Sequence, residues 1–295
     1  MDNVKINKMQ HAEGFIAALD QSGGSTPKAL SLYGITNSSW NNDEEMFSLV
    51  HEMRTRIIKS QSFTGKNIIA AILFENTMDR KINNLPTADY LWNEKNILPI
   101  LKVDKGLSDE NNGVQLMNPM PQLDNLLQKA KSNGIFGTKM RSVIKQYSDQ
   151  GIEEIVEQQF LLAKQILSFG LVPIIEPEVD IHCPEKDAAE HKLNACLIES
   201  LNKLDSNSLV MLKLTLPEEN NLYIDCVNHE KTLRVVALSG GYSREEANKR
   251  LYNQKGMIAS FSRALSEGLS VNQSDDEFDD MLRKSIKQIC EASRT

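Results

Sequence analysis

The stretch Leu209-Val210-Met211-Leu212-Lys213-Leu214-Thr215-Leu216-Pro217 places one lysine in the middle of an apolar run. The run is short, ends at a proline and is rich in branched residues, which favours a β-strand over a helix. A strand that is apolar on both faces is typical of a sheet covered on both sides, and so of a parallel sheet in an α/β protein. Lys213 must there reach solvent, pair with a carboxylate or lose its charge, and the uncharged amine is a nucleophile. This stretch alone leaves open whether the lysine is structural or reactive.

Further apolar runs of this kind alternate with segments of helical periodicity. We expect strands at 15–20, 68–74, 97–104, 135–141, 171–178, 209–216, 233–241 and 257–263. Helices are predicted at 43–58, 88–95, 123–132, 152–168, 188–203, 222–228 and 278–292, with further helix starts at Pro27 and Ser243. Right-handed crossovers close such a series into a (β/α)8 (TIM) barrel, here as a single domain over 1–295.

An open, doubly wound sheet is the alternative α/β fold for this series of elements. It requires a glycine-rich dinucleotide-binding loop after the first strand. Gly23 and Gly24 follow that strand but do not have the spacing of such a loop. The barrel is therefore preferred.

The composition, with 40% hydrophobic and 25% charged residues, is that of a soluble globular protein. A net charge of −7 argues against nucleic acid as the main partner, although a local basic pocket can still bind phosphorylated substrates. The first residues hold no apolar signal segment, and no run approaches the length of a membrane span. The cysteines form no C-x-x-C pair, so we expect reduced thiols in a cytoplasmic protein.

Polar side chains gather at the carboxyl ends of the predicted strands. They are Asp20, Lys102, Asp104, Lys139, Arg141, Glu176, Glu178, Lys213, Ser239 and Arg263. In a barrel this end carries the active site in essentially every characterised enzyme. Residues two apart on a strand share a face, so Lys139 points the same way as Arg141, and Glu176 the same way as Glu178. A solvated charge network is the alternative for any one residue, but it does not explain the whole set.

The loop after the seventh predicted strand has the features of an anion site. Ser239-Gly240-Gly241 precedes a helix with the capping-box pattern Ser243-Arg244-Glu245-Glu246, and both offer backbone N–H groups. Arg263, one strand later, adds a fork-shaped cation. Because barrels often hold a phosphate at this position, we expect a phosphate site here.

Other sources of a nucleophile find little support. The five histidines show no metal-ligand spacing, and no serine or cysteine lies in a nucleophile-elbow pattern. Lys213 is therefore the leading candidate for covalent chemistry.

Several short segments, in order, resemble the class I (Schiff-base) fructose-bisphosphate aldolases. They are AALDQS at 17–22, LKVDKG at 101–106, TKMR at 138–141, GLVPIIEPE at 170–178, LK at 212–213, LSGG at 238–241 and SFSRAL at 260–265. In length the chain looks like the short bacterial branch. The resemblance implies reversible cleavage of fructose 1,6-bisphosphate to dihydroxyacetone phosphate and glyceraldehyde 3-phosphate, in glycolysis and gluconeogenesis, with neither a metal nor another cofactor.

The resemblance also implies roles for individual residues. Lys213 forms the Schiff base, Glu176 is the acid and base of imine formation, and Asp20 takes the proton of the C4 hydroxyl. Because Glu176 must act in both directions, we expect its pKa to be raised. Glu178, Lys139 and Arg141 position the reacting groups. The family's 1-phosphate positions are matched by Ser239, Gly240, Ser260 and Arg263, and its 6-phosphate positions by Ser22, Ser25 and Lys102.

Two departures from the family, and several alternatives, stay open. Ala29 stands where longer members carry an arginine, so contacts to the 6-phosphate are expected to differ. The sequence ends in 292–295 without the terminal tyrosine that helps protonate the enamine in animal enzymes, so another residue or water is expected to supply that proton. A tagatose-bisphosphate aldolase, a transaldolase or, more remotely, an inactive barrel acting as a binding protein are the alternatives. The oligomeric state is not predicted.

Overall fold

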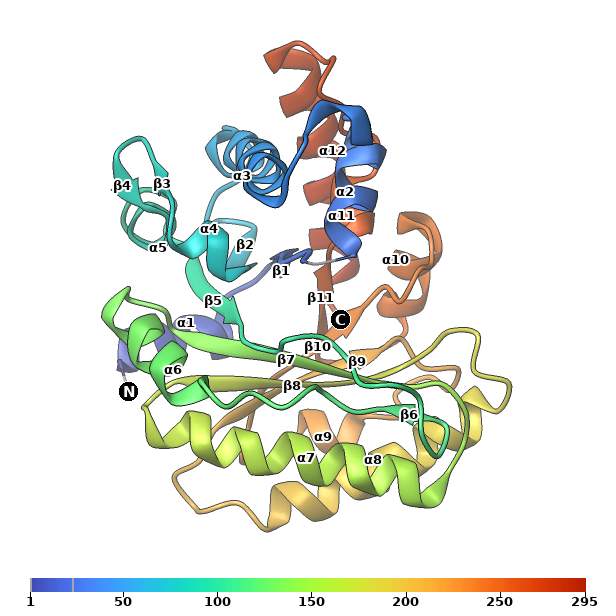
Figure 1. The fold of residues 1–295 in the computed structure, drawn as a ribbon. Helices are drawn as coiled ribbons and strands as arrows, with labels where there is room; N and C mark the ends of the chain where they lie inside the picture. The colour runs from blue at the N-terminus through green and yellow to red at the C-terminus, as the bar shows by residue number, and fades with distance from the viewer. Residues whose placement is uncertain (1, 23) are drawn as a thin grey trace.

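The computed structural model describes residues 2–22 and 24–295. Its parallel strands are β1 (Phe15–Leu19), β2 (Ile68–Leu73), β5 (Leu98–Lys102), β7 (Gly137–Ile144), β8 (Val172–Val179), β9 (Val210–Thr215), β10 (Thr232–Leu238) and β11 (Met257–Phe261). They form a closed ring because β1 pairs with β11 and β5 pairs with β7 (Figure 1). The (β/α)8 barrel predicted from the alternating apolar runs is therefore confirmed.

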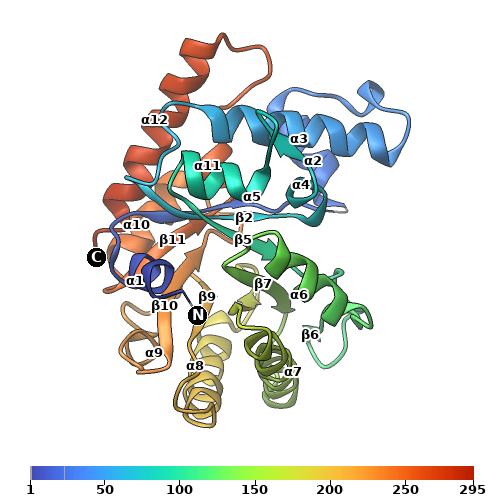
Figure 2. The same cartoon turned by 90° about the vertical axis from the view of Figure 1, so that its left-hand side faces the viewer.

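Helices surround the ring of strands. The longer ones are α2 (Ser25–Tyr33), α3 (Asp43–Lys59), α6 (Leu123–Ser132), α7 (Asp149–Ser168), α8 (Lys186–Asn202), α10 (Arg244–Tyr252) and α12 (Asp275–Ala292). The pair α7 and α8 lies on one side of the barrel, and α2, α3 and α12 lie on the opposite side (Figures 1 and 2). In the described part of the chain, no helix combines the length and apolar character needed to cross a membrane.

The main differences from expectation concern short elements. Helix α1 (Asn3–His11) was not predicted, because Met9 is its only buried residue and gives no periodic apolar pattern. The helix expected at 88–95 is α5 (Thr87–Asp89) followed by a π-helical segment, Tyr90–Glu94, and that expected at 222–228 shrinks to α9 (Ile224–Val227). Further short elements lie in the loops: α4 (Glu75–Met78), β3 (Lys81–Ile82), β4 (Leu85–Pro86), β6 (Val114–Gln115), a 3-10 turn at Asn37–Ser39 and α11 (Arg263–Ser266).

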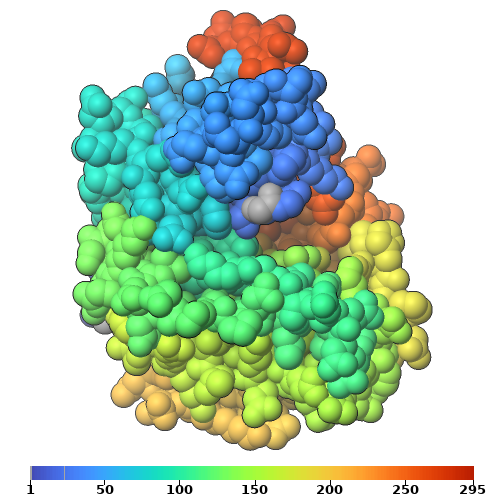
Figure 3. Space-filling view, in the orientation of Figure 1, coloured from blue at the N-terminus to red at the C-terminus, as the bar shows by residue number. Residues whose placement is uncertain are grey.

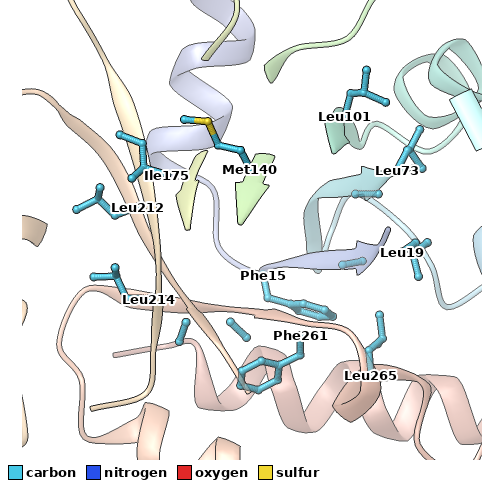
Figure 4. Close-up of a cluster of buried hydrophobic side chains, with 14 of the residues drawn as sticks. Phe15, Leu19, Leu73, Leu101, Met140, Ile175, Leu212, Leu214, Phe261 and Leu265 are labelled. Carbon is cyan, nitrogen blue, oxygen red and sulfur yellow. The ribbon is translucent and has the colours of Figure 1, made fainter. Parts of the chain in front are cut away.

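Alternation along the strands separates two layers of buried side chains. On β9, Met211 belongs to the cluster inside the barrel, whereas Leu212 and Leu214 belong to the layer between barrel and helices. Figure 4 shows this outer layer, in which Leu212 lies beside Ile175 of the neighbouring strand. The inner face of β9 therefore carries Met211 and then Lys213, so the apolar filling of the barrel gives way to charge at its carboxyl end.

Candidate active site

A cavity of about 560 Å³ opens at the carboxyl ends of the strands. It is lined from β1, β5, β7, β8, β9, β10 and β11, from the residues just beyond them and from helix α2. Those predicted from the sequence are Asp20, Ser22, Ser25, Lys102, Lys139, Arg141, Glu176, Glu178, Lys213, Ser239, Gly240, Ser260 and Arg263. Gly241 lies beside them, since a Cβ added there would be 3.4 Å from Nη2 of Arg263. In the space-filling view, the blue helices α2 and α3 lie directly above the green middle part of the chain (Figure 3).

Four buried charges form a continuous chain at the bottom of this cavity. Lys213 Nζ lies 2.9 Å from Glu176 Oε1, and Lys139 Nζ lies 2.9 Å from Glu176 Oε2. Lys139 Nζ also lies 2.7 Å from Asp20 Oδ2. The exposed fraction is 8% for Asp20 and 2–4% for the other three, so the charges depend on one another for compensation. Two cations thus balance two carboxylates within one small, buried volume.

The pKa shifts follow from this alternation of charge. Burial alone would raise the pKa of Glu176, but the Lys139 and Lys213 cations outweigh it and hold that pKa below its ordinary value. The same two lysines, acting against burial, hold the pKa of Asp20 far below its ordinary value. Burial would lower the pKa of Lys139, but Asp20 and Glu176 raise it well above normal. The expectation of a raised pKa for Glu176 is therefore wrong for the free protein, because two lysines from neighbouring strands flank the carboxyl.

Two further ion pairs line the wall of the cavity. Arg141 Nε donates to Glu178 Oε2 at 2.6 Å, and Lys102 Nζ donates to Asp104 Oδ1 at 2.5 Å. The backbone N–H of Arg141 also donates to Asp104 Oδ2, at 3.2 Å. Asp104 was noted in the sequence only as a charged strand end, and the structure shows that it joins Lys102 to β7.

One end of the cavity holds groups suited to an anion. Gly240 and Gly241 have φ angles of 60° and 126°, and a Cβ on Gly240 would lie 2.6 Å from Cγ2 of Ile181. This tight turn therefore requires glycine and brings the main chain close to the cavity. The Ser260 hydroxyl is buried and has no hydrogen-bond partner among residues 2–22 and 24–295. In the same described part of the chain, Arg263 forms no salt bridge, so its charge is available to a ligand.

The other end of the cavity lies under the start of α2. The Ser25 hydroxyl accepts a hydrogen bond from the Ser22 N–H at 2.9 Å and donates one to the Ser22 carbonyl at 2.8 Å. Lys28 and Ala29 line the cavity here, so an exposed lysine stands next to the alanine that departs from the family pattern. Sequence reasoning missed Lys28, although a basic residue in the first turns of α2 was the available signal.

Gln21 is a second residue that sequence reasoning missed. Its Nε2 donates to Ser262 Oγ at 2.6 Å, which ties the end of β1 to the end of β11. Behind it, the fully buried Arg54 on α3 donates to the Gln21 carbonyl at 2.5 Å. Burial lowers the pKa of Arg54 to about 10, against the opposing effect of Asp20. These partners are far apart in the sequence, so no local pattern reveals them.

Comparison with known proteins decides the family. The model of the family "Glycolytic", described as fructose-bisphosphate aldolase class-I, matches residues 4–224. The protein named fructose-bisphosphate aldolase class 1 from Synechocystis is 61% identical over 291 residues, which cover 99% of this chain and 97% of that protein. The chain belongs to the class I fructose-bisphosphate aldolase family. The resemblance drawn from short segments of the sequence is thus confirmed.

A further relative and a solved structure are also similar to this chain. The Clostridium acetobutylicum protein of the same name is 58% identical over 295 residues, covering 100% of both chains. The structure also matches that of fructose-bisphosphate aldolase from Plasmodium falciparum in complex with TRAP and a small molecule inhibitor, with a TM-score of 0.81. That match covers 98% of this chain and 93% of the other at 22% identity, and it shows a shared fold.

Proposed function

We propose that the chain catalyses reversible aldol cleavage of fructose 1,6-bisphosphate to dihydroxyacetone phosphate and glyceraldehyde 3-phosphate through a Schiff base on Lys213. The observation that carries this proposal is the 2.9 Å contact between the buried Lys213 amine and Glu176, inside a cavity with cations at both ends. The names of the relatives, which are 58–61% identical, support the choice of substrate.

Imine formation begins with transfer of a proton from Lys213 to Glu176. The free amine then attacks the C2 carbonyl of the ketose, and the carbinolamine hydroxyl leaves as water after Glu176 returns the proton to it. Lys139 stays charged throughout, because Asp20 and Glu176 hold its pKa high. It thereby keeps the Glu176 carboxyl in place during both transfers.

Cleavage of the C3–C4 bond uses the iminium as an electron sink. Asp20 takes the proton of the C4 hydroxyl, the C3–C4 electron pair moves toward the iminium, and an enamine and an aldehyde result. A positioned base of this kind contributes on the order of 10²–10⁴-fold to the rate. The contacts of Lys139 with both Asp20 and Glu176 support this role, because they hold the Asp20 carboxylate beside the group that forms the imine. Glu178 and Arg141, paired at 2.6 Å, hold the adjoining wall in position.

Phosphate groups at the two ends of the substrate fix its register. We assign the 1-phosphate to Ser239, Gly240, Gly241, Ser260 and Arg263, and the 6-phosphate to Ser22, Ser25 and Lys102, with Lys28 nearby. Binding at both ends converts the reaction with Lys213 into an oriented, effectively unimolecular step.

We further propose that neither a metal ion nor another cofactor takes part, and that the enzyme acts in the cytoplasm on phosphorylated sugars. Each carboxylate of the cavity is paired with a cation, as Lys102, Lys139, Arg141 and Lys213 show. Ammonium and guanidinium groups therefore occupy the positions at which these carboxylates would bind a metal.

The test is reductive trapping of the Schiff base. Borohydride added with dihydroxyacetone phosphate should leave a covalent adduct on Lys213, identified by peptide mass spectrometry, and the Lys213→Met variant should give none. An adduct on another lysine, or no adduct, refutes the mechanism. Cleavage of fructose and tagatose bisphosphates side by side then tests the substrate, with faster turnover of the fructose isomer expected.

A further inference from the structure

The β8–β9 ladder stops next to the reacting residues. Within the described chain, its paired positions are Ile174 with Met211 and Ile175 with Leu212. The next residues on the two strands are Glu176 and Lys213, whose side chains meet at 2.9 Å. On its other side β8 stays paired with β7 along its whole length, from Val172 to Val179. The main chain of Glu176 therefore lacks ladder support on the side where Lys213 lies.

Gln159 on α7 supports Glu176 from behind the sheet. Its Oε1 accepts a hydrogen bond from the Glu176 N–H at 3.0 Å, and its Nε2 donates to Ser142 Oγ on β7 at 2.6 Å. The side chain has no exposed surface, and it interrupts an otherwise apolar face of the helix that includes Ile155 and Phe160. A buried amide is tolerated where its polar atoms are bonded, so its presence on this face is explained by those two bonds.

Two residues beyond Lys213, Thr215 links β9 to β8 again through its side chain. Its hydroxyl accepts a hydrogen bond from the Val179 N–H at 2.9 Å and donates one to the Val179 carbonyl at 2.7 Å. One side chain, 1% exposed, thereby occupies both backbone groups of the β8 residue. Strands β8 and β9 are thus connected on both sides of Glu176 and Lys213: by the ladder that ends at Ile175 and Leu212, and by Thr215 and Val179 beyond them.

We propose that Gln159 and Thr215 are positioning residues for the Schiff-base reaction, holding β8 and β9 so that the Glu176 carboxylate meets the Lys213 amine. The inference rests on the proposed roles of Glu176 and Lys213. Neither positioning residue lines the cavity, so both act through the main chain of β8. The charged groups around Glu176 are Lys139 and Arg141 from β7, Lys213 from β9 and Asp20, which follows the last residue of β1. A displaced carboxyl loses contact with the lysines first, because they lie closest to it.

The experiment compares Gln159→Met and Thr215→Val, which keep the size of the side chain and remove its hydrogen bonds. Both should lower kcat for fructose 1,6-bisphosphate cleavage by about ten- to a hundred-fold, since small misplacements of reacting groups have effects of this order. In Gln159→Met, KM should change little, because the assigned phosphate contacts lie on elements other than α7 and β8. Thr215 Cγ2 lies 3.8 Å from the position that a Cβ on Gly240 would take, so for Thr215→Val the fall in kcat, and not KM, is the measure. The acid limb of the kcat profile should move to higher pH, since a Glu176 carboxyl farther from the lysines loses the cations that lower its pKa.

Matched variants separate positioning from general destabilisation. Gln254 is also buried, accepts a backbone hydrogen bond from Asn221 at 2.8 Å and lies outside the cavity lining. Gln254→Met should lower Tm while leaving kcat and its pH profile unchanged. Thr215→Ser keeps the hydroxyl and should restore most of the activity. If Gln159→Met does not fold, the difference in kcat between Thr215→Val and Thr215→Ser tests the inference.

The possible results are distinguishable. A wild-type kcat and pH profile in Gln159→Met and Thr215→Val would overturn the inference, as would a loss of kcat no larger than that of Gln254→Met at an equal fall in Tm. In both cases the wild-type protein still forms the borohydride adduct on Lys213, so the proposed function stands. Absence of that adduct in the wild type overturns the proposed function, and the inference with it.

Discussion

Replacing Lys139 by methionine removes the central cation of the buried charge chain and leaves two carboxylates facing each other. Its ammonium lies 2.7 Å from Asp20 and 2.9 Å from Glu176. At an effective dielectric constant of about 20, each such contact corresponds to about 6 kcal/mol of gross Coulomb attraction, much of which offsets desolvation. Removing one partner of a buried pair typically costs about 3–5 kcal/mol, so we expect a loss of this size in the free energy of unfolding at pH 8.

The loss of stability in Lys139→Met should depend on pH, because Asp20 and Glu176 titrate. In the wild type the pKa values of Asp20 and Glu176 are depressed, so their stabilising contribution is present above the unfolded-state pKa values and is lost as pH falls through the folded ones. Without Lys139, the largest opposing cation is gone and Lys213 remains as the nearest one, so the pKa values of Asp20 and Glu176 should rise and protonation should then stabilise the fold at acidic pH. The stability difference between wild type and variant should therefore be largest at pH 8 and shrink toward pH 5.

Urea unfolding of both proteins at several pH values measures this difference. Lys145→Met is the matched control, because Lys145 pairs with Asp180 at 2.5 Å while its side chain is 37% exposed. An exposed pair of this kind is worth about 0–1 kcal/mol, so the control should lose little and show little pH dependence. The reasoning is refuted if Lys139→Met costs no more than Lys145→Met, or if its cost is the same at pH 5 and pH 8.

Three further predictions concern phosphate binding by Arg263, the glycine turn at Gly240 and the use of a metal. Arg263→Ala should raise KM for fructose 1,6-bisphosphate by about ten- to a hundred-fold with a smaller effect on kcat, since a hydrogen bond to a charged group is worth about 1.5–3 kcal/mol; steady-state kinetics with an unchanged KM would exclude the assigned phosphate site. Gly240→Ala should also weaken substrate binding, because its Cβ would lie 2.6 Å from Ile181; wild-type binding of dihydroxyacetone phosphate by calorimetry would contradict this. Activity should survive excess chelator, and a loss that zinc restores would overturn the proposal of a metal-free reaction.

Much of the fold could be predicted because each strand carries its own signal. The run from Leu209 to Leu216 is apolar on both faces, and the two-residue spacing of Lys139 and Arg141 placed both on the cavity side. Helix α1 was missed because only Met9 in it is buried, so burial leaves no periodic pattern. Gln159 was missed for a different reason. Its partners Ser142 and Glu176 are each 17 residues away, and only the packing of α7 on the sheet brings them together.

The arrangement of charges also bears on whether Lys213 is structural or reactive. Within residues 2–22 and 24–295, Glu176 forms salt bridges with two lysines, whereas Asp20 forms one with Lys139 only. Transfer of the Lys213 proton to Glu176 leaves the net charge of the group unchanged and keeps the Lys139–Asp20 pair intact. Removal of the proton from Lys139 would instead leave Asp20 as a buried carboxylate without its partner, which is strongly unfavourable. The network therefore favours Lys213 as the lysine that releases its proton, and Lys139 as the one that remains a cation.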